Sequence, residues 1–453
     1  MAPTSDKKGR SPAAGDIGGK GALRRLGTNS GKLLGGRVAN AVMGLATTAL
    51  AIRTLGMETF GVLMLVHTVA LVSGTLFDFR LGHSVLAYGA SRLERDDVPG
   101  FRRLIAFALR LQCAALGIAI PVSAVGVFWL GPWLEWPQAS LPGAALYMAV
   151  IAFQPNGRLE AGILRLFNRF DHIALLHSAQ SLARLVGTAL LWQAGLGDLS
   201  LFLALWFGAA MIHSAGIAGS AYRELRIRGL LPQRILRPGP AADMETGLWR
   251  FVCLTNLNAT LGLTFSRLGT LLVGGLFGPA QAGLFHVADR LAKAVGGAVK
   301  AVRPAIGPEI AQLLATGSQR RLRRLMLRAM AIGAGTAVGL LAVIALAGPS
   351  LLELMGGDQA RSAYVLMLLL AVATLTTLAT FPFTPLLNAA GRPGRITISN
   401  AIATVIYLVA LLTLAPRIGL EAAGVAAVLA IIGRRAIEAT AVFPLLRSAP
   451  DVE

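Results

Sequence analysis

Long apolar stretches constrain this chain more than any other feature of its sequence. A helix that crosses a lipid bilayer needs about 20 predominantly apolar residues. Twelve such stretches are present, at 33–52, 60–79, 104–130, 139–160, 172–195, 199–221, 247–273, 277–302, 325–348, 362–388, 394–415 and 420–446. No strand-like alternation is sustained along the chain, which argues against a membrane barrel. We therefore expect an all-α integral membrane protein with about 12 transmembrane helices.

Basic residues are concentrated in the N-terminal segment and in every second loop between the apolar stretches. The chain has 42 Lys and Arg against 22 Asp and Glu, which gives a net charge of +20. If the N-terminus is cytoplasmic, 29 of the 42 fall in inner segments or, for Arg158, Arg328 and Arg395, in the adjoining span ends, and only Arg53, Arg361 and Arg417 fall in outer segments. Because cytoplasmic loops are enriched in Lys and Arg, we expect both termini in the cytoplasm. The charge then reflects topology, and nucleic acid is not an expected partner.

Short motifs recur in the two halves of the chain at almost the same offset. The pairs are Gly56–Gly61 with Gly278–Gly283, Arg102–Leu104 with Arg323–Leu325, and Arg169 with Arg392, at offsets of 221 to 223 residues. We therefore expect two six-helix lobes related by a parallel internal repeat. The predicted units are a disordered basic cytoplasmic tail (1–32), an N-terminal lobe (33–222), a cytoplasmic linker (223–246), a C-terminal lobe (247–446) and a cytoplasmic tail (447–453).

Several of these motifs resemble a known family. Arg53–Leu63 followed by Phe77–Gly82 resembles the N-terminal signature of the polysaccharide exporters, the Wzx-type flippases of lipid-linked oligosaccharides. Phe277–Phe285 and Leu386–Arg392 are similar to motifs in the second half of that family. The family belongs to the MOP superfamily and is related to the MATE antiporters and the lipid II flippases.

The resemblance implies a MATE-like (MOP) fold and a role in polysaccharide biosynthesis, such as that of lipopolysaccharide or exopolysaccharide. The implied activity is flipping of an undecaprenyl-diphosphate-linked oligosaccharide from the cytoplasmic to the outer leaflet by alternating access. It also implies a multi-pass protein of the bacterial cell inner (plasma) membrane. Its partners would be the bilayer, the lipid-linked glycan, glycosyltransferases and a polysaccharide polymerase.

Apart from Arg158, Arg328 and Arg395 near the cytoplasmic span ends, ten cations lie within the predicted spans, against few acids. A charge in hydrocarbon costs about 2.5–3.5 kcal/mol on insertion scales, so embedded charges normally face a cavity or a partner. Arginine binds phosphate through paired donors, and we predict a cationic cavity for a diphosphate. The residues predicted to line it are Arg37, Arg184, Arg267, Arg290 and Lys293.

Other embedded or membrane-edge residues are candidates for coupling or gating. They are His67, Asp78, Arg80, His286 and Asp289. Histidine titrates near neutral pH and can carry a proton, although a hydrogen-bonded interior histidine is the alternative. Asp289 either orients the neighbouring cations or simply neutralises Lys293 at i,i+4. We expect no cofactor and no metal site, and coupling to H⁺ or Na⁺ stays open.

Prolines interrupt two predicted spans that are counterparts in the repeat. Pro155 lies in span four, and Pro382 and Pro385 lie in span ten. Because proline breaks the helical hydrogen-bond ladder, equivalent interruptions predict a bend or a binding site there. A passive kink is the alternative.

Two other function classes remain. The first is a MATE-like ion-coupled antiporter of small molecules, although the excess of embedded cations disfavours cationic drugs. The second is an enzyme, a polyprenyl-linked glycan polymerase or ligase. The longest outer stretches are about 131–138 and 349–361, too short for a catalytic platform, and no phosphate-binding loop motif for ATP is present. We therefore expect a transporter and not an enzyme.

Overall fold

The computed structural model of the protein describes residues 19–154, 158–232, 249, 252, 253, 256, 257, 260, 267–296 and 303–447. Throughout this described part the regular elements are helices. Pro155 lies outside the described residues, and Arg37 lies in a described helix although its side chain is not described.

The first helix, α1 (Gly19–Leu76), joins the first two predicted spans across a kink. At Gly56 the backbone takes φ 77° and ψ 167°, a conformation open to glycine because it has no Cβ. The helix also begins inside the segment 1–32 that the sequence predicts to be a disordered tail. No proline interrupts residues 19–32, and Ala22 and Leu23 are strong helix formers, so the helix of span one can continue toward the N-terminus.

The rest of the described N-terminal half is a bundle of three long helices and several shorter ones. Its elements are α2 (Leu81–Ser84), the π-helical turn η1 (Val85–Gly89), α3 (Ala90–Glu94), α4 (Val98–Trp133), the 3₁₀ segment η2 (Gln138–Ser140), α5 (Leu141–Tyr147), the 3₁₀ segment η3 (Met148–Phe153), α6 (Leu159–Leu166), α7 (Phe170–Gln193) and α8 (Leu199–Ile227). Span four is therefore made of α5 and η3, which end just before the proline-containing segment.

The C-terminal half forms a second bundle. Its elements are α10 (Arg267–Phe277), α11 (Pro279–Gly296), α12 (Arg303–Ala315), α13 (Gln319–Arg361), α14 (Tyr364–Ala379), α15 (Phe383–Ala389), α16 (Pro393–Ile418) and α17 (Glu421–Arg447). The tenth predicted span is divided into α14 and α15, which are bent by 42°. Pro382 precedes the first residue of α15, at the point where a proline ring no longer clashes with a preceding turn.

Five helical segments of the described part are long and apolar enough to cross a membrane, and the bent pair α14 and α15 makes a sixth. One of the five, Val38–Glu94, contains two predicted spans across the kink at Gly56. The other predicted spans coincide with helices that are shorter or carry charges, except that most of span seven lies outside the described residues.

The charged side chains of α17 are buried in an ion-pair network. The Glu438 carboxylate is fully buried and pairs with both Arg434, at 2.9 Å, and Arg435. Ser399 of α16 donates a third hydrogen bond to the same carboxylate, at 3.2 Å. Buried ions are normally paired in this way because unpaired ones are costly to desolvate.

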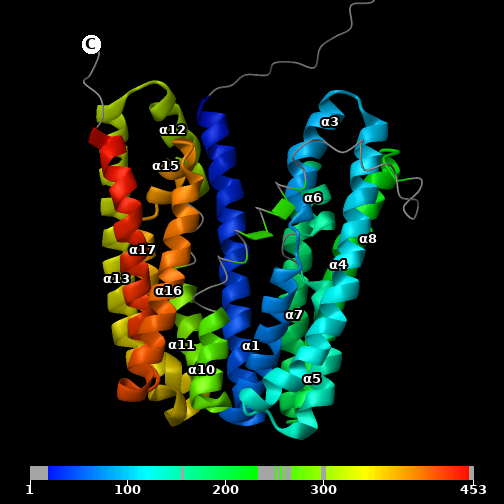
Figure 1. The fold of residues 1–453 in the computed structure, drawn as a ribbon, viewed down its shortest axis with the longest axis vertical. Coiled ribbons are helices and arrows are strands. Elements are labelled where there is room, and N and C mark those ends of the chain that lie inside the picture. Colours follow the sequence, from blue (N-terminus) through cyan, green and yellow to red (C-terminus); the bar gives the residue numbers. More distant parts are fainter. Residues whose placement is uncertain are drawn as a thin grey trace, which may run out of the picture.

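Figure 1 shows the two bundles side by side, with α1 between them. One bundle contains α4, α5, α7 and α8, and the other contains α13, α16 and α17. The bundles stand apart at the end where α3 and α12 lie. At the opposite end residues of the two halves touch, as the hydrogen bond from the Arg53 guanidinium to the Leu354 carbonyl shows.

Candidate functional site

Two glycines that correspond in the internal repeat set the crossing of α1 and α11. A Cβ atom added to Gly61 would lie 1.8 Å from the Pro279 carbonyl oxygen. One added to Gly283 would lie 3.0 Å from the Met57 carbonyl oxygen and 3.4 Å from the Gly61 Cα. Small residues let helix backbones approach closely. The crossing therefore holds the side chains of α11 against α1 and the N-terminal bundle.

Five basic or imidazole side chains from four helices gather at this junction. His67 of α1 lies within electrostatic reach of every other member of the group. The other members are Arg184 of α7, Arg267 of α10, and His286 and Arg290 of α11. We call these five residues the central cationic cluster. Both bundles contribute to it, which is the arrangement that a site between two lobes requires.

On the N-terminal side, aromatic side chains hold the cluster. His67 Nδ1 lies 2.8 Å from the Tyr147 hydroxyl, and its ring meets the Trp206 ring edge-on, with centroids 4.9 Å apart. The Arg184 guanidinium lies over the Trp206 ring, 4.8 Å from its centroid, a favourable cation–π geometry. His67 is thus hydrogen-bonded through one nitrogen, as the alternative interpretation of an interior histidine anticipates.

On the C-terminal side, Arg290 reaches across to α1. A Cβ atom on Gly44 would lie 2.1 Å from Arg290 Nη2, so the guanidinium occupies the space that this glycine leaves free. The His286 ring packs edge-on against Phe60, with centroids 6.1 Å apart.

Two polar atoms of the cluster are buried without a hydrogen-bond partner among the described residues. They are His286 Nε2 and Arg184 Nε. Buried polar atoms in native proteins nearly always have partners, so orphaned ones at a junction of charged side chains indicate a position where a ligand or water completes the bonding.

Asp289 and Lys293 form an ion pair beside the cluster. Lys293 Nζ lies 2.7 Å from the Asp289 carboxylate, one turn away on the same helix. The pair supports the simpler of the two interpretations, in which the aspartate neutralises the lysine. Asp289 also lies within electrostatic reach of Arg267, so the carboxylate borders the cluster without entering its centre.

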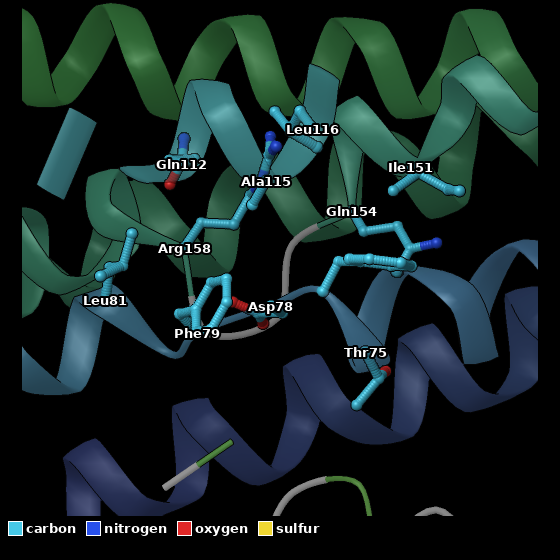
Figure 2. A pocket seen from close by; sticks show the side chains of 12 residues that line it. Thr75, Asp78, Phe79, Leu81, Gln112, Ala115, Leu116, Ile151, Gln154 and Arg158 are labelled. Atoms are coloured by element: carbon cyan, nitrogen blue, oxygen red, sulfur yellow. The ribbon is translucent and has the colours of Figure 1, made fainter. Parts of the chain in front are cut away.

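Asp78 and Arg80 lie elsewhere, at the end of α1 beyond Leu76. The Arg80 backbone N–H donates to Asp78 Oδ1 at 3.0 Å. Asp78 lines a small pocket of about 30 Å³, with Gln112, Gln154 and Arg158 also on its wall. Figure 2 shows these side chains. The structure therefore does not bring these two residues to the central cationic cluster.

Sequence reasoning missed three residues that build the cluster. Tyr147 and Trp206 support His67 and Arg184, and Gly44 leaves room for Arg290. An aromatic residue or a glycine in an apolar span carries no signal of its own, because both are common in membrane helices. A contact between helices distant in sequence is needed to find them.

Known proteins resemble the chain mainly in fold. No family model matches it. The inner membrane protein YghQ of Escherichia coli (strain K12) is 28% identical over 347 residues, which cover 77% of this chain and 97% of that protein. An inward-facing multidrug resistance MATE family transporter of the MOP superfamily superposes with a TM-score of 0.66 at 16% identity, covering 92% of this chain and 96% of that one. This chain has the MATE fold.

Two further solved structures agree over nearly the whole length. A mutant form of the Vibrio cholerae MATE transporter VcmN gives a TM-score of 0.59 at 15% identity, covering 95% of this chain and 99% of that one. The eukaryotic MATE transporter AtDTX14 gives 0.60 at 13% identity, covering 93% and 98%. The expectation of an all-α, MATE-like fold is confirmed.

Proposed function

We propose that the protein is a multi-pass transporter of the bacterial inner membrane, that its two lobes work by alternating access, and that its central cationic cluster binds an anionic substrate. The MATE fold and the name of the relative YghQ support the membrane and the transport class. The observation that carries the proposal is the cluster itself, because Arg184 and His67 come from one bundle and Arg267, His286 and Arg290 from the other.

The distribution of contacts between the bundles supports alternating access. Besides the Arg53–Leu354 hydrogen bond, Trp133 of α4 packs so closely on Gly275 of α10 that a Cβ there would lie 2.5 Å from the indole ring. These residues lie at the end that the positive-inside pattern assigns to the outer face. The bundles stand apart at the other end (Figure 1), in keeping with the inward-facing state of the similar MATE transporter.

The favoured substrate is an undecaprenyl-diphosphate-linked oligosaccharide, flipped from the cytoplasmic to the outer leaflet during polysaccharide biosynthesis. A diphosphate presents closely spaced anionic oxygens, and guanidinium groups bind such oxygens through paired donors. The cluster offers three arginines near the crossing of α1 and α11, with Asp289 occupied by Lys293. With this substrate, glycosyltransferases and a polysaccharide polymerase would be the protein's partners.

A second candidate is an ion-coupled antiporter of small molecules. The resemblance to MATE transporters of known structure favours it. With this cluster such an antiporter would select anionic molecules, because a cationic one would meet arginine and imidazole side chains at the centre.

Reconstitution separates the two candidates. The purified protein in proteoliposomes is given either a fluorescent polyprenyl-diphosphate oligosaccharide in the bilayer or an anionic dye in the lumen. We expect the lipid-linked glycan to flip faster than in protein-free liposomes. Dye efflux driven by a proton or sodium gradient without glycan flipping would establish the antiporter instead. If the protein shows neither glycan flipping nor dye efflux, the proposed function is rejected.

Lys293→Gln is expected to slow glycan flipping only modestly. The lysine side chain is 39% exposed and already paired with Asp289, and an exposed ion pair is worth about 0.2–1 kcal/mol. Flipping rates in the same liposomes should fall by about five-fold or less. A Lys293→Arg variant, which keeps the charge, serves as the control. A loss as severe as that expected for the central arginines would place Lys293 on the substrate.

Arg53→Ala is expected to loosen the closed end of the protein. The exposed Arg53–Leu354 hydrogen bond, at 3.0 Å, is worth about 0.5–1.5 kcal/mol, so its loss shifts a two-state equilibrium by up to about ten-fold. Spin labels at the exposed Ser200 and Ser350, in a variant without Cys113 and Cys253, report the separation of the bundles. Identical distance distributions with and without Arg53 would show that this contact does not hold the closed state.

A further inference from the structure

The N-terminal bundle contains a second polar pocket, away from the junction of the lobes. Its volume is about 150 Å³, and α6, α7, α8 and Arg158 form its walls. The polar residues that line it are Arg158, Glu160, Arg165, His177, His213 and Ser214. A cavity of this size admits a ligand as large as benzene, and therefore also a phosphate group.

Hydrogen bonds fix two of these residues. The Arg158 guanidinium donates to the Ala152 carbonyl and, at 3.4 Å, to Ser214 Oγ. Gln112 of α4 donates to Glu160 Oε1 at 2.8 Å. The amide thus occupies one oxygen of the single carboxylate on the pocket wall, whereas the Ser214 hydroxyl keeps its own proton to donate.

The other polar residues of the wall are His213, His177 and Arg165. His213 is only 3% exposed, and its Nδ1 is buried without a hydrogen-bond partner in the part of the chain that the structure describes. Its ring stands edge-on to that of His177, with centroids 6.0 Å apart. Arg165 lines the same pocket, and Arg184 of the central cationic cluster lies within electrostatic reach of both histidines.

These groups share one chemistry. Arginine and serine donate hydrogen bonds, and each histidine ring can donate through at least one nitrogen. Three arginines act on the pocket, against Glu160 on its wall and Asp78, which lies within electrostatic reach of Arg158, so the positive charges are in excess. A ligand that uses all of these donors has several acceptor oxygens and a negative charge.

We propose that this pocket between α6, α7 and α8 binds a phosphate-type oxyanion, with Arg158, Arg165, His213 and Ser214 as the donors. The group comes either from free phosphate or from the headgroup of an anionic lipid. All the lining residues belong to one bundle. Because no residue of the other bundle lines the site, a movement of the lobes against each other leaves its walls in place, unlike those of the central cationic cluster.

Binding is tested with the full-length protein in nanodiscs of phosphatidylcholine. Radiolabelled inorganic phosphate is titrated at constant ionic strength, and the thermal unfolding midpoint is followed in parallel. Arg165→Gln and His213→Leu remove donors from the pocket. Arg226→Gln removes an exposed arginine of α8 that does not line it, and Arg290→Gln alters only the central cationic cluster.

We expect saturable binding whose Kd rises by about ten-fold or more in Arg165→Gln and His213→Leu and stays unchanged in Arg226→Gln. If His213→Leu fails to elute as a folded monodisperse particle, Arg165→Gln carries the test alone, because Arg165 is partly exposed and not buried in the core.

A second arm distinguishes the sources of the group. Nanodiscs containing phosphatidylglycerol raise the unfolding midpoint of the wild-type protein, and not that of Arg165→Gln, if a lipid headgroup occupies the pocket. Free phosphate as the natural ligand leaves the midpoint unaffected by phosphatidylglycerol. The proposal is overturned if neither probe binds, or if phosphate binding survives in Arg165→Gln and disappears in Arg290→Gln, which would assign it to the central cationic cluster.

Discussion

Arg290→Gln is expected to lower substrate transport by about 10- to 100-fold. Arg290 reaches from α11 of one bundle to Gly44 on α1 and lies within electrostatic reach of Arg184 on the other bundle. A hydrogen bond to a charged group contributes about 1.5–3 kcal/mol, and each 1.4 kcal/mol changes a rate or binding constant ten-fold. The initial rate of glycan flipping in proteoliposomes measures the loss.

Two matched variants sharpen this experiment. Arg290→Lys keeps the positive charge but loses the paired donors, so we expect a rate between those of the wild-type protein and Arg290→Gln. Arg226→Gln removes an exposed arginine far along α8 from the cluster, and its rate is expected to match the wild type. Wild-type flipping by Arg290→Gln would show that the central cationic cluster does not contact the substrate.

Apolar length was the part of the fold that the sequence predicted well. Among the described residues each predicted span from 33–52 to 420–446 overlaps helical segments, because burial of about 20 apolar residues leaves the helix as the only way to satisfy the backbone. The exact ends of the helices are harder to predict from the sequence. The early start of α1 at Gly19, for example, is a matter of helix propensity outside the span.

Part of the site can be predicted from the sequence, because charged residues are costly within a membrane and normally face a cavity or a partner. His67, Arg184, Arg267, His286 and Arg290 stood out as polar residues in apolar spans, and the structure brings them together. Sequence spacing relates residues on one helix but not on different helices. Within α11 the spacing predicts both a shared role of Arg290 and Lys293 and the i,i+4 pair of Lys293 with Asp289, and the structure contains that pair.

Asp78 and Arg80 are candidates for coupling or gating because they are charged residues at the membrane edge. Asp78 and Arg80 follow span two in a stretch that resembles the exporter signature. In the structure Asp78 lines a separate pocket with Gln112 and Arg158, near the end of α1 (Figure 2). The predicted role of Asp78 and Arg80 in coupling or gating stays a proposal. These residues would act at the edge of one bundle, outside the central cationic cluster.

Gly61 and Gly283 correspond in the internal repeat and lie where α1 and α11 pack closely. A larger residue at Gly61 is therefore expected to destabilise the protein. Gly61→Ala is expected to lower the free energy of unfolding by about 1–3 kcal/mol, the usual cost of overpacking. The added Cβ would lie 1.8 Å from the Pro279 carbonyl oxygen. That oxygen belongs to the backbone, so no side-chain rotation relieves the clash, and α1 and α11 have to move apart.

Other glycines of the chain provide the comparison. Gly283→Ala places its Cβ 3.0 Å from the Met57 carbonyl oxygen, so we expect a smaller loss than for Gly61→Ala. Gly117 in α4 and Gly335 in α13 have no atom within 4 Å of an added Cβ. Alanine there removes the helix penalty of glycine, about 1 kcal/mol, and is expected to leave stability unchanged or higher.

Unfolding midpoints in mixed micelles with increasing sodium dodecyl sulfate measure all four variants under one condition. The order expected from least to most stable is Gly61→Ala, Gly283→Ala, wild type, and then Gly117→Ala with Gly335→Ala. Because the crossing of α1 and α11 also places Arg290 against Gly44, Gly61→Ala should reduce transport along with stability. Equal midpoints for Gly61→Ala and Gly117→Ala would mean that the two helices do not cross at these glycines, and the central cationic cluster would lose its geometric basis.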